Sequence, residues 1–411
     1  MDSLAQRTSS TFTLKLLTFM MFLIFAMTTD AVGVIIPEII EEFDLSLTQA
    51  STFHYSVMIA IAVSGMGLGF LADKFGRKPA IIFGLALFGF ACFLFPLGSS
   101  FSYFLLLLTM TGLAIGVFKT AALALIGDIA KDSREHTQTM NLAEGFFGIG
   151  AIIGPAVVTW LILRGLPWIY LYVIAGALAG LLIVIAWLTQ YPSTPVTSSK
   201  PTNWKTSLKL AKDPYAFCFS MAIALYVVVE AGIYVWMPTL LADYNGSATW
   251  MAAYALTLFF VFRALGRFFG AWLLNYMNWK VGMLFCTAMI FLCFIGSIAL
   301  GVEAAVYLLP MSGIFMSIVY PTINSKGISC YPTEQHGAVA GVILFFTAVA
   351  AALGPLAMGV VGDAMGHVRY GFGFAMVCSG FLFALALWNA LRDPAAEKLT
   401  EMNALNSSLS S

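Results

Sequence analysis

The chain has 411 residues, of which 60% are hydrophobic and only 10% are charged, and its formal net charge is zero. A water-soluble domain carries about 25% charged residues, so this composition, with a mean hydropathy of +0.91, excludes a soluble globule. The length can instead supply roughly twelve spans of ~20 apolar residues joined by short connections.

The apolar runs predict twelve transmembrane helices, because a segment in lipid must satisfy its own backbone hydrogen bonds. They are expected at residues 14–37, 50–72, 79–97, 101–127, 138–163, 167–190, 214–240, 249–273, 281–300, 303–324, 336–361 and 370–391. The polar stretch from Tyr191 to Asp213 divides them into two halves. The predicted domains are an N-terminal six-helix bundle (1–191), a cytoplasmic linker (192–213), a C-terminal six-helix bundle (214–392) and a cytoplasmic tail (393–411).

The distribution of basic residues predicts the orientation. If both termini are cytoplasmic, the inner loops and tails hold fifteen lysines and arginines, and the outer loops hold only Arg164 and Arg369. Basic residues stay on the cytoplasmic side. We therefore expect a multi-pass protein of the cell (inner) membrane with both termini inside. The first apolar run is long enough to span and is expected to be retained rather than cleaved as a signal peptide.

The two halves repeat each other at an offset near 200 residues. Gly154–Pro155 matches Gly354–Pro355, and Pro37 matches Pro238. Several matches that share one offset indicate a gene duplication. The six cysteines have no paired spacing, so they are expected to be small buried apolar residues rather than disulfides or metal ligands.

Ionisable residues inside the predicted spans are the candidate functional groups. A charge at the bilayer centre costs roughly 2.5–3.5 kcal/mol on the translocon scale, so it should face a partner or a water-filled cavity. There are six: Asp30, Lys119, Glu144, Glu230, Arg263 and Arg267. Three acids and three bases favour a set of neutralising pairs around a central cavity.

Each of these charges has two interpretations. Asp30 and Glu230, 200 residues apart, either lock a neighbouring helix or titrate and touch the solute. Lys119 and Glu144 form either a structural pair or part of the binding site. Arg267 is expected to face the interior, whereas the partner of Arg263 could be Asp30, Glu230 or the inner surface.

Hydroxyl and amide groups in other spans complete the predicted site, although helix packing is the alternative role for each one. The expected substrate- and ion-binding residues are Asp30, Lys119, Asn141, Glu144, Tyr226, Glu230, Arg267, Tyr320 and Asn324. Polar groups at this depth usually mark a transport pathway. Asp30 is the expected proton carrier, since Arg263 and Arg267 lie on the helix that follows Glu230.

The segment from Gly69 to Lys78, GFLADKFGRK, lies between two apolar runs. It resembles the loop signature of the major facilitator superfamily at every fixed position. The resemblance implies two pseudo-symmetric six-helix bundles, an all-α membrane fold. It also implies that Asp73, Arg77 and Asp128 form a charge network on the inner face that gates the transporter rather than binding solute.

Three further segments resemble the fucose–galactose–proton symporter branch of that superfamily: Asn141-Leu-Ala-Glu144, Gly266-Arg267-Phe-x-Gly270, and Tyr320-Pro321-Thr-Ile after Phe315-Met-Ser-Ile. The resemblance implies uptake of a sugar with a proton. The chain departs from the branch pattern where Lys119 replaces a glutamate, Glu144 replaces a glutamine, and Asp30 and Gly33 replace an asparagine and an acid.

The expected function is secondary active transport of a small polar solute, above all a sugar, by a monomer that alternates access and uses H+ as coupling ion. The alternatives are a proton-driven exporter of drugs or metabolites, a transporter of a charged organic solute, and a membrane receptor. No phosphate loop, nucleophile elbow or metal-ligand cluster is found, so we expect no enzyme activity, cofactor, metal or nucleic-acid partner.

Overall fold

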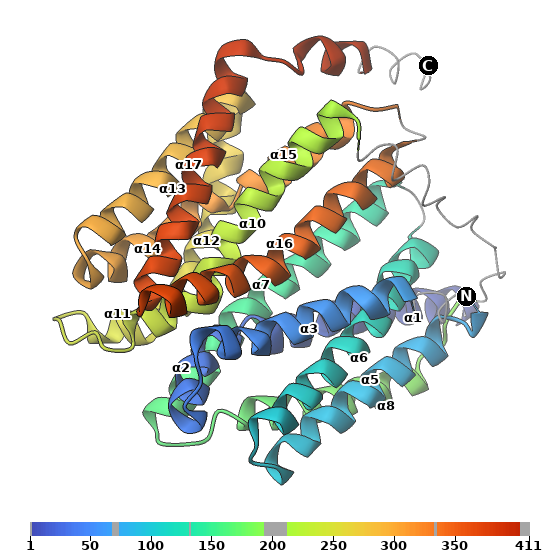
Figure 1. Ribbon diagram of the computed structural model, residues 1–411. Coiled ribbons are helices and arrows are strands. Elements are labelled where there is room, and N and C mark those ends of the chain that lie inside the picture. The colour runs from blue at the N-terminus through green and yellow to red at the C-terminus, as the bar shows by residue number, and fades with distance from the viewer. Residues whose placement is uncertain (1, 68–73, 131–132, 193–211, 333–334, 403–411) are drawn as a thin grey trace. The chain divides into compact units, whose positions relative to one another are not determined.

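The computed structural model describes residues 2–67, 74–130, 133–192, 212–332 and 335–402, and every element in these ranges is a helix (Figure 1). The helices form two compact units. Unit 1 comprises residues 1–45 and 52–199, and unit 2 comprises 46–51 and 200–411. The all-α membrane fold predicted from the sequence is confirmed.

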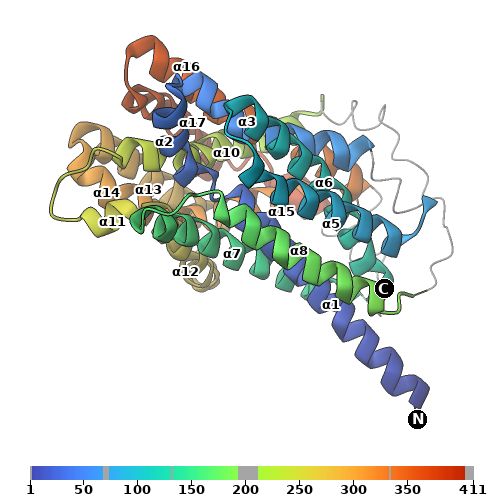
Figure 2. The same cartoon turned by 90° about the horizontal axis from the view of Figure 1, so that it is seen from below.

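Unit 1 contains the helices of the first half. They are α1 (Asp2–Thr29), α2 (Val32–Phe43), α3 (Leu47–Gly67, from Thr52 on), α5 (Arg77–Leu94), the 3-10 turn η1 (Phe95–Leu97), α6 (Phe101–Ile129), α7 (Ser133–Leu163) and α8 (Tyr170–Leu188). Helix α1 packs against α7, and α5 packs between α6 and α8 (Figure 2).

Unit 2 repeats this arrangement in the second half. Its helices are α10 (Pro214–Leu241), the short α11 (Thr249–Ala253), α12 (Ala255–Tyr276), α13 (Trp279–Ala299), α14 (Val302–Met316), α15 (Val319–Ser329), α16 (His336–Met365) and α17 (Val368–Arg392). Helix α10 packs against α16, as α1 does against α7, and α13 packs against both α14 and α17 (Figure 1).

Ten of the described segments are long and apolar enough to cross a membrane. The two remaining predicted spans are also helices, α3 and α12, but α12 carries Arg263 and Arg267, and α3 carries several polar residues near its start. All twelve predicted spans therefore have a helical counterpart in the described part of the chain.

Glycine at matching positions allows close helix contacts in both units. A Cβ on Gly154 of α7 would lie 2.1 Å from the Met27 carbonyl oxygen of α1, and one on Gly354 of α16 would lie 3.0 Å from the Val228 Cα of α10. Small residues let helix backbones approach closely in membranes. The 200-residue repeat therefore has a structural meaning: it places the same close contact in both units.

Two predicted spans are interrupted in their middle. The first, predicted at 14–37 and observed as Thr11–Phe43, changes from α1 to α2 at Asp30 and Ala31, where Thr28 and Thr29 bond back to the carbonyls of Ile24 and Phe25. Such back-bonding competes with the helix backbone and bends it.

The second interruption lies in the span Val302–Ser329, between α14 and α15 at Ser317 and Ile318. Pro321 has no N–H to donate to the Ser317 carbonyl, so the helical ladder cannot continue unbroken. The sequence predicted both spans as continuous helices, and the interruptions are a correction to that expectation.

Candidate functional site

In unit 2 a polar cluster is buried beside the α14–α15 interruption. Glu230 of α10 forms an ion pair with Arg263 of α12, with 2.6 Å between Oε1 and Nη2. The Tyr226 hydroxyl lies 2.8 Å from the same carboxylate oxygen and 3.0 Å from the carbonyl oxygen of Met316, the last residue of α14. The hydroxyl has one proton, so it donates to one of these two acceptors at a time. It can therefore switch between the Glu230 carboxylate and the Met316 carbonyl.

Burial makes this pairing necessary. Glu230 is only 7% exposed and Tyr226 is fully buried. An unpaired carboxylate in such a place would be strongly unfavourable, and one that keeps its ion pair and a hydrogen bond is much less so. The sequence left the partner of Arg263 open, and the structure identifies it as Glu230.

Tyr320 and Asn324 extend the cluster along α15. The Tyr226 and Tyr320 rings are 6.3 Å apart between centroids, and the Tyr320 hydroxyl lies 3.4 Å from the Thr347 hydroxyl of α16. Asn324 follows Tyr320 by one turn, so it shares a helix face with it. Arg267 is exposed, and its charge acts on Tyr226.

In unit 1 the candidate residues gather around Lys119 of α6. Its ammonium lies 4.5 Å from the ring centroid of Phe25, 5.6 Å from that of Phe22 and 5.9 Å from that of Phe147. Cation–π attraction of this kind is worth more where water is excluded. The sequence did not single out these phenylalanines, because aromatic residues are common throughout the spans.

The acids of unit 1 act on Lys119 from a greater distance. Glu144 of α7 exerts the larger electrostatic effect and Asp30 the smaller. Within the described ranges no carboxylate lies inside the 4.0 Å ion-pair limit of the Lys119 ammonium. Glu144 and Asn141 are exposed on α7, and Asp30 is half-buried at the α1–α2 interruption.

Two of the three predicted gating residues come together at the end of unit 1 where α5 begins. Arg77 Nε donates to Asp128 Oδ2 over 2.8 Å, and both side chains are largely buried. Lys78 beside it donates to the carbonyls of Trp187 and Thr189 at the end of α8. Asp73 lies outside the described residues.

Unit 2 has its own polar contacts at the corresponding helix ends. Asp213, the N-cap of α10, accepts the backbone N–H groups of Tyr215 and Ala216 and the Tyr331 hydroxyl. Burial, and then the hydrogen bond to Asp213, raise the pKa of Tyr331 well above its usual value. Lys280 at the start of α13 pairs with Asp393 after α17.

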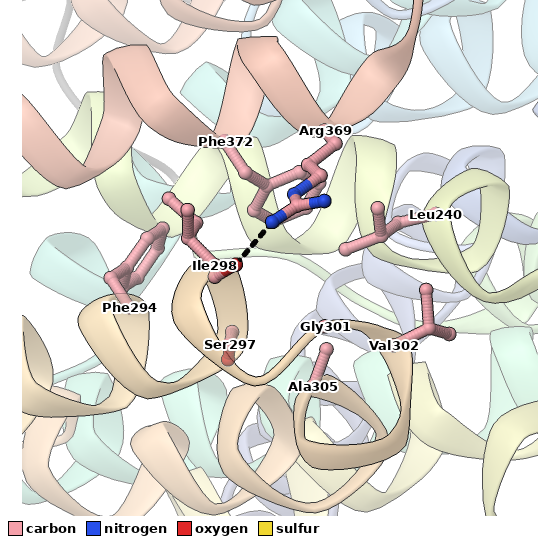
Figure 3. A pocket seen from close by; sticks show the side chains of 9 residues that line it. All are labelled: Leu240, Phe294, Ser297, Ile298, Gly301, Val302, Ala305, Arg369 and Phe372. Carbon is pink, nitrogen blue, oxygen red and sulfur yellow. Dashed lines mark hydrogen bonds between the residues drawn. The ribbon is translucent and has the colours of Figure 1, made fainter.

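A separate small cavity of about 150 Å³ lies between α10, α13, α14 and α17. Its walls are mainly apolar, among them Leu240, Phe294 and Phe372, and Arg369 at its side donates to the Ile298 carbonyl over 2.5 Å (Figure 3). It contains none of the predicted binding residues. In the described part of the chain, no cluster of three or more His, Cys, Asp or Glu could hold a metal ion.

The fold and the charged residues inside its spans are those of a membrane transporter, and the chain belongs to the Major Facilitator Superfamily, whose family model matches residues 18–355. It is 25% identical over 400 residues to the L-fucose-proton symporter of Escherichia coli (strain K12), covering 89% of this chain and 90% of that one. It is 22% identical over 382 residues to a glucose/galactose transporter of Brucella abortus, covering 88% and 90%.

Among solved structures, a bacterial homologue of the human lysosomal transporter Spinster, in an inward-facing and occupied conformation, superposes with a TM-score of 0.75 at 17% identity. The match covers 94% of this chain and 97% of that one. The predicted membership of the superfamily is therefore confirmed. The chain is a multi-pass membrane transporter rather than an enzyme.

Proposed function

We propose that the protein is a proton-coupled secondary transporter of a sugar or similar polyol that works by alternating access. One observation carries this proposal: each unit holds an acid at or beside an interrupted spanning helix. Asp30 lies in the α1–α2 interruption, and Glu230 reaches the α14–α15 interruption through Tyr226. Interrupted helices supply substrate and ion sites near the membrane midplane of secondary transporters.

The proposal of a sugar rests on the chemistry of the candidate residues and on the relatives. In unit 1, Asn141 offers an amide and Glu144 an exposed carboxylate, and in unit 2, Tyr320 offers a hydroxyl and Asn324 an amide. Groups of these kinds match the donors and acceptors of a polyol. Relatives described as fucose-proton and glucose/galactose transporters cover most of the chain.

Proton coupling is assigned to Asp30. Glu230 is held by Arg263 at 2.6 Å, so its negative charge is compensated on the spot. Asp30 lies near Lys119, whose charge Glu144 compensates more strongly than Asp30 does. The position of Asp30 in the α1–α2 interruption supports it as the acid that binds and releases the proton.

Orientation and assembly complete the proposal. The basic asymmetry of the loops supports cytoplasmic termini in a cell (inner) membrane, which would put the Arg77–Asp128 pair on the cytoplasmic face. There the pair acts as a gate rather than as a binding site. The two bundles, with boundaries near 191 and 214, would move relative to each other within a monomer.

The test is accumulation in liposomes that contain the purified protein. Radiolabelled L-fucose, D-galactose and D-glucose are offered under an inward proton gradient. We expect at least one to accumulate above its equilibrium level and to leak out when a protonophore is added. Equilibration without accumulation would contradict proton coupling, and the absence of any uptake or exchange of all three would contradict the sugar assignment.

Lys119 favours a second candidate, transport of a charged organic solute. Its ammonium rests on aromatic rings and has no carboxylate within ion-pair distance among the described residues, so it can receive an anionic group of a solute. A thermal-shift screen of sugars, organic acids and amphipathic cations separates the candidates, because a ligand that binds only the folded state raises its stability. A shift with sugar acids but not with neutral sugars would replace the first proposal.

A further inference from the structure

The beginning of α3 belongs to unit 2, although the rest of this helix belongs to unit 1. Residues 46–51 cluster with unit 2, and the chain passes into unit 1 at Thr52. The contact that holds these residues is made by Asp363, in the last turn of α16. Its Oδ1 accepts the Leu47 N–H and its Oδ2 accepts the Thr48 N–H, each over 2.8 Å.

The α3 helix caps only part of its own N-terminus. Ser46 Oγ accepts the Gln49 N–H over 3.2 Å, and Gln49 Oε1 accepts the Ser46 N–H over 3.0 Å, which is a reciprocal capping box. The first N–H groups of a helix have no partner within it. The capping box leaves the N–H groups of Leu47 and Thr48 without an acceptor in α3. Asp363 accepts hydrogen bonds from both of these groups. One carboxylate therefore completes the cap of a helix distant in sequence.

Two glycines of α16 allow α3 to approach closely enough for this contact. A Cβ on Gly359, one turn before Asp363, would lie 3.0 Å from the Leu47 carbonyl oxygen, and one on Gly362 would lie 2.5 Å from the Leu47 side chain. The hydroxyls of Ser46 and Thr48 also interact with the Asp363 carboxylate. Charge, hydrogen bonding and close packing thus all stabilise the contact between Asp363 and the start of α3.

We propose that Asp363 is a latch that holds the start of α3 on α16 in one state of the transport cycle and releases it in the other. The inference rests on the proposed alternating access, in which unit 1 moves relative to unit 2. Such a movement displaces residues 52–67 together with unit 1. It therefore strains the contact that residues 46–51 make with Asp363. Because Asp363 is exposed, water can replace it at the freed N–H groups, and the latch is reversible.

The test measures the two states directly, without solute. Spin labels are placed at Glu42→Cys and Met365→Cys in a Cys218→Ser background, since the other five cysteines are buried. Double electron–electron resonance then gives the populations of short and long distances. Asp363→Ala should raise the ratio of long to short about five-fold, as expected for the loss of a helix cap, and Asp363→Asn, which keeps one acceptor oxygen, should raise it less.

Two variants serve as controls. Asp243→Ala removes the same charge from an exposed position after α10 and should leave the ratio at the wild-type value. Gly359→Val keeps the carboxylate but displaces Leu47, so it should also raise the ratio, and it decides the question if Asp363→Ala does not fold. An unchanged ratio in Asp363→Ala, or in Gly359→Val if that variant alone folds, overturns the latch. If the ratio shifts but no sugar is transported, only the proposed substrate fails.

Discussion

The Glu230–Arg263 pair shows how a single contact limits the roles that its members can take. Glu230 is nearly buried, and 24% of the Arg263 side chain is exposed. A pair so placed lies between exposed pairs, which contribute about 0–1 kcal/mol, and buried pairs, where loss of one partner costs about 3–5 kcal/mol. Its main effect is to prevent an unpaired charge inside unit 2.

A double-mutant cycle tests this role. Glu230→Gln and Arg263→Gln should each lower the apparent Tm by several degrees, because each leaves one charge without its partner. The double variant should lose less than the sum of the two, since no unpaired charge remains. Thermal unfolding in detergent measures all four proteins. Strictly additive losses would contradict a direct interaction between these side chains.

Asp30 is predicted to carry the coupling proton. Asp30→Asn should abolish accumulation driven by a proton gradient, because the amide cannot exchange a proton, yet it should preserve exchange of solute across the liposome membrane. The measurement is uptake against counterflow in the same preparation. Asp243→Asn, which changes an exposed acid after α10, is the matched control and should still accumulate solute. Normal accumulation by Asp30→Asn would pass the role to Glu230 or Glu144.

At the scale of elements, close helix packing depends on a few glycines. Helix α7 approaches the α1 backbone at Gly150 and Gly154, where an added Cβ would lie 2.2 Å from the Leu23 carbonyl oxygen and 2.1 Å from that of Met27. Overpacking of a tight contact costs typically 1–3 kcal/mol. The α1–α7 contact should therefore tolerate no larger side chain without a shift of the backbone.

Gly154→Ala should accordingly destabilise the protein by about 1–3 kcal/mol. Gly145→Ala is the control on the same helix, since a Cβ there meets no described atom within 4 Å. It should be neutral or stabilising by up to ~1 kcal/mol through helix propensity. Thermal unfolding compares the two, and an equal effect of both would contradict the packing argument.

At the scale of the whole molecule, the orientation follows from the loops rather than from the helices. The polar connection between the halves contains four lysines, whereas the end of the first span is acidic. Within this family of fold both halves should then begin and end on the cytoplasmic side.

Labelling of single cysteines tests this orientation. In intact cells, an impermeant maleimide should react with Asp44→Cys and should not react with Lys205→Cys, which lies in the predicted linker. Permeabilised cells provide the control, because both positions should then react. Labelling of Lys205→Cys alone in intact cells would invert the proposed topology.

Much of the architecture could be predicted from the sequence alone. Hydropathy is a property of consecutive residues, so the spans, the division into halves and the charges inside the spans are visible without a structure. The repeat of Gly154–Pro155 at Gly354–Pro355 also had a direct structural counterpart. The pairing of Arg77 with Asp128 could be predicted because Arg77 belongs to a recognisable loop motif.

The tertiary structure alone decided which of these groups meet. Helices that are apolar on all sides show no stripe that marks a buried face, so the sequence could not choose a partner for Arg263 or place three phenylalanine rings around Lys119. The rotation and crossing of helices set those contacts. The Asp363 cap of α3 joins residues more than 300 positions apart, and no local pattern in the chain connects them.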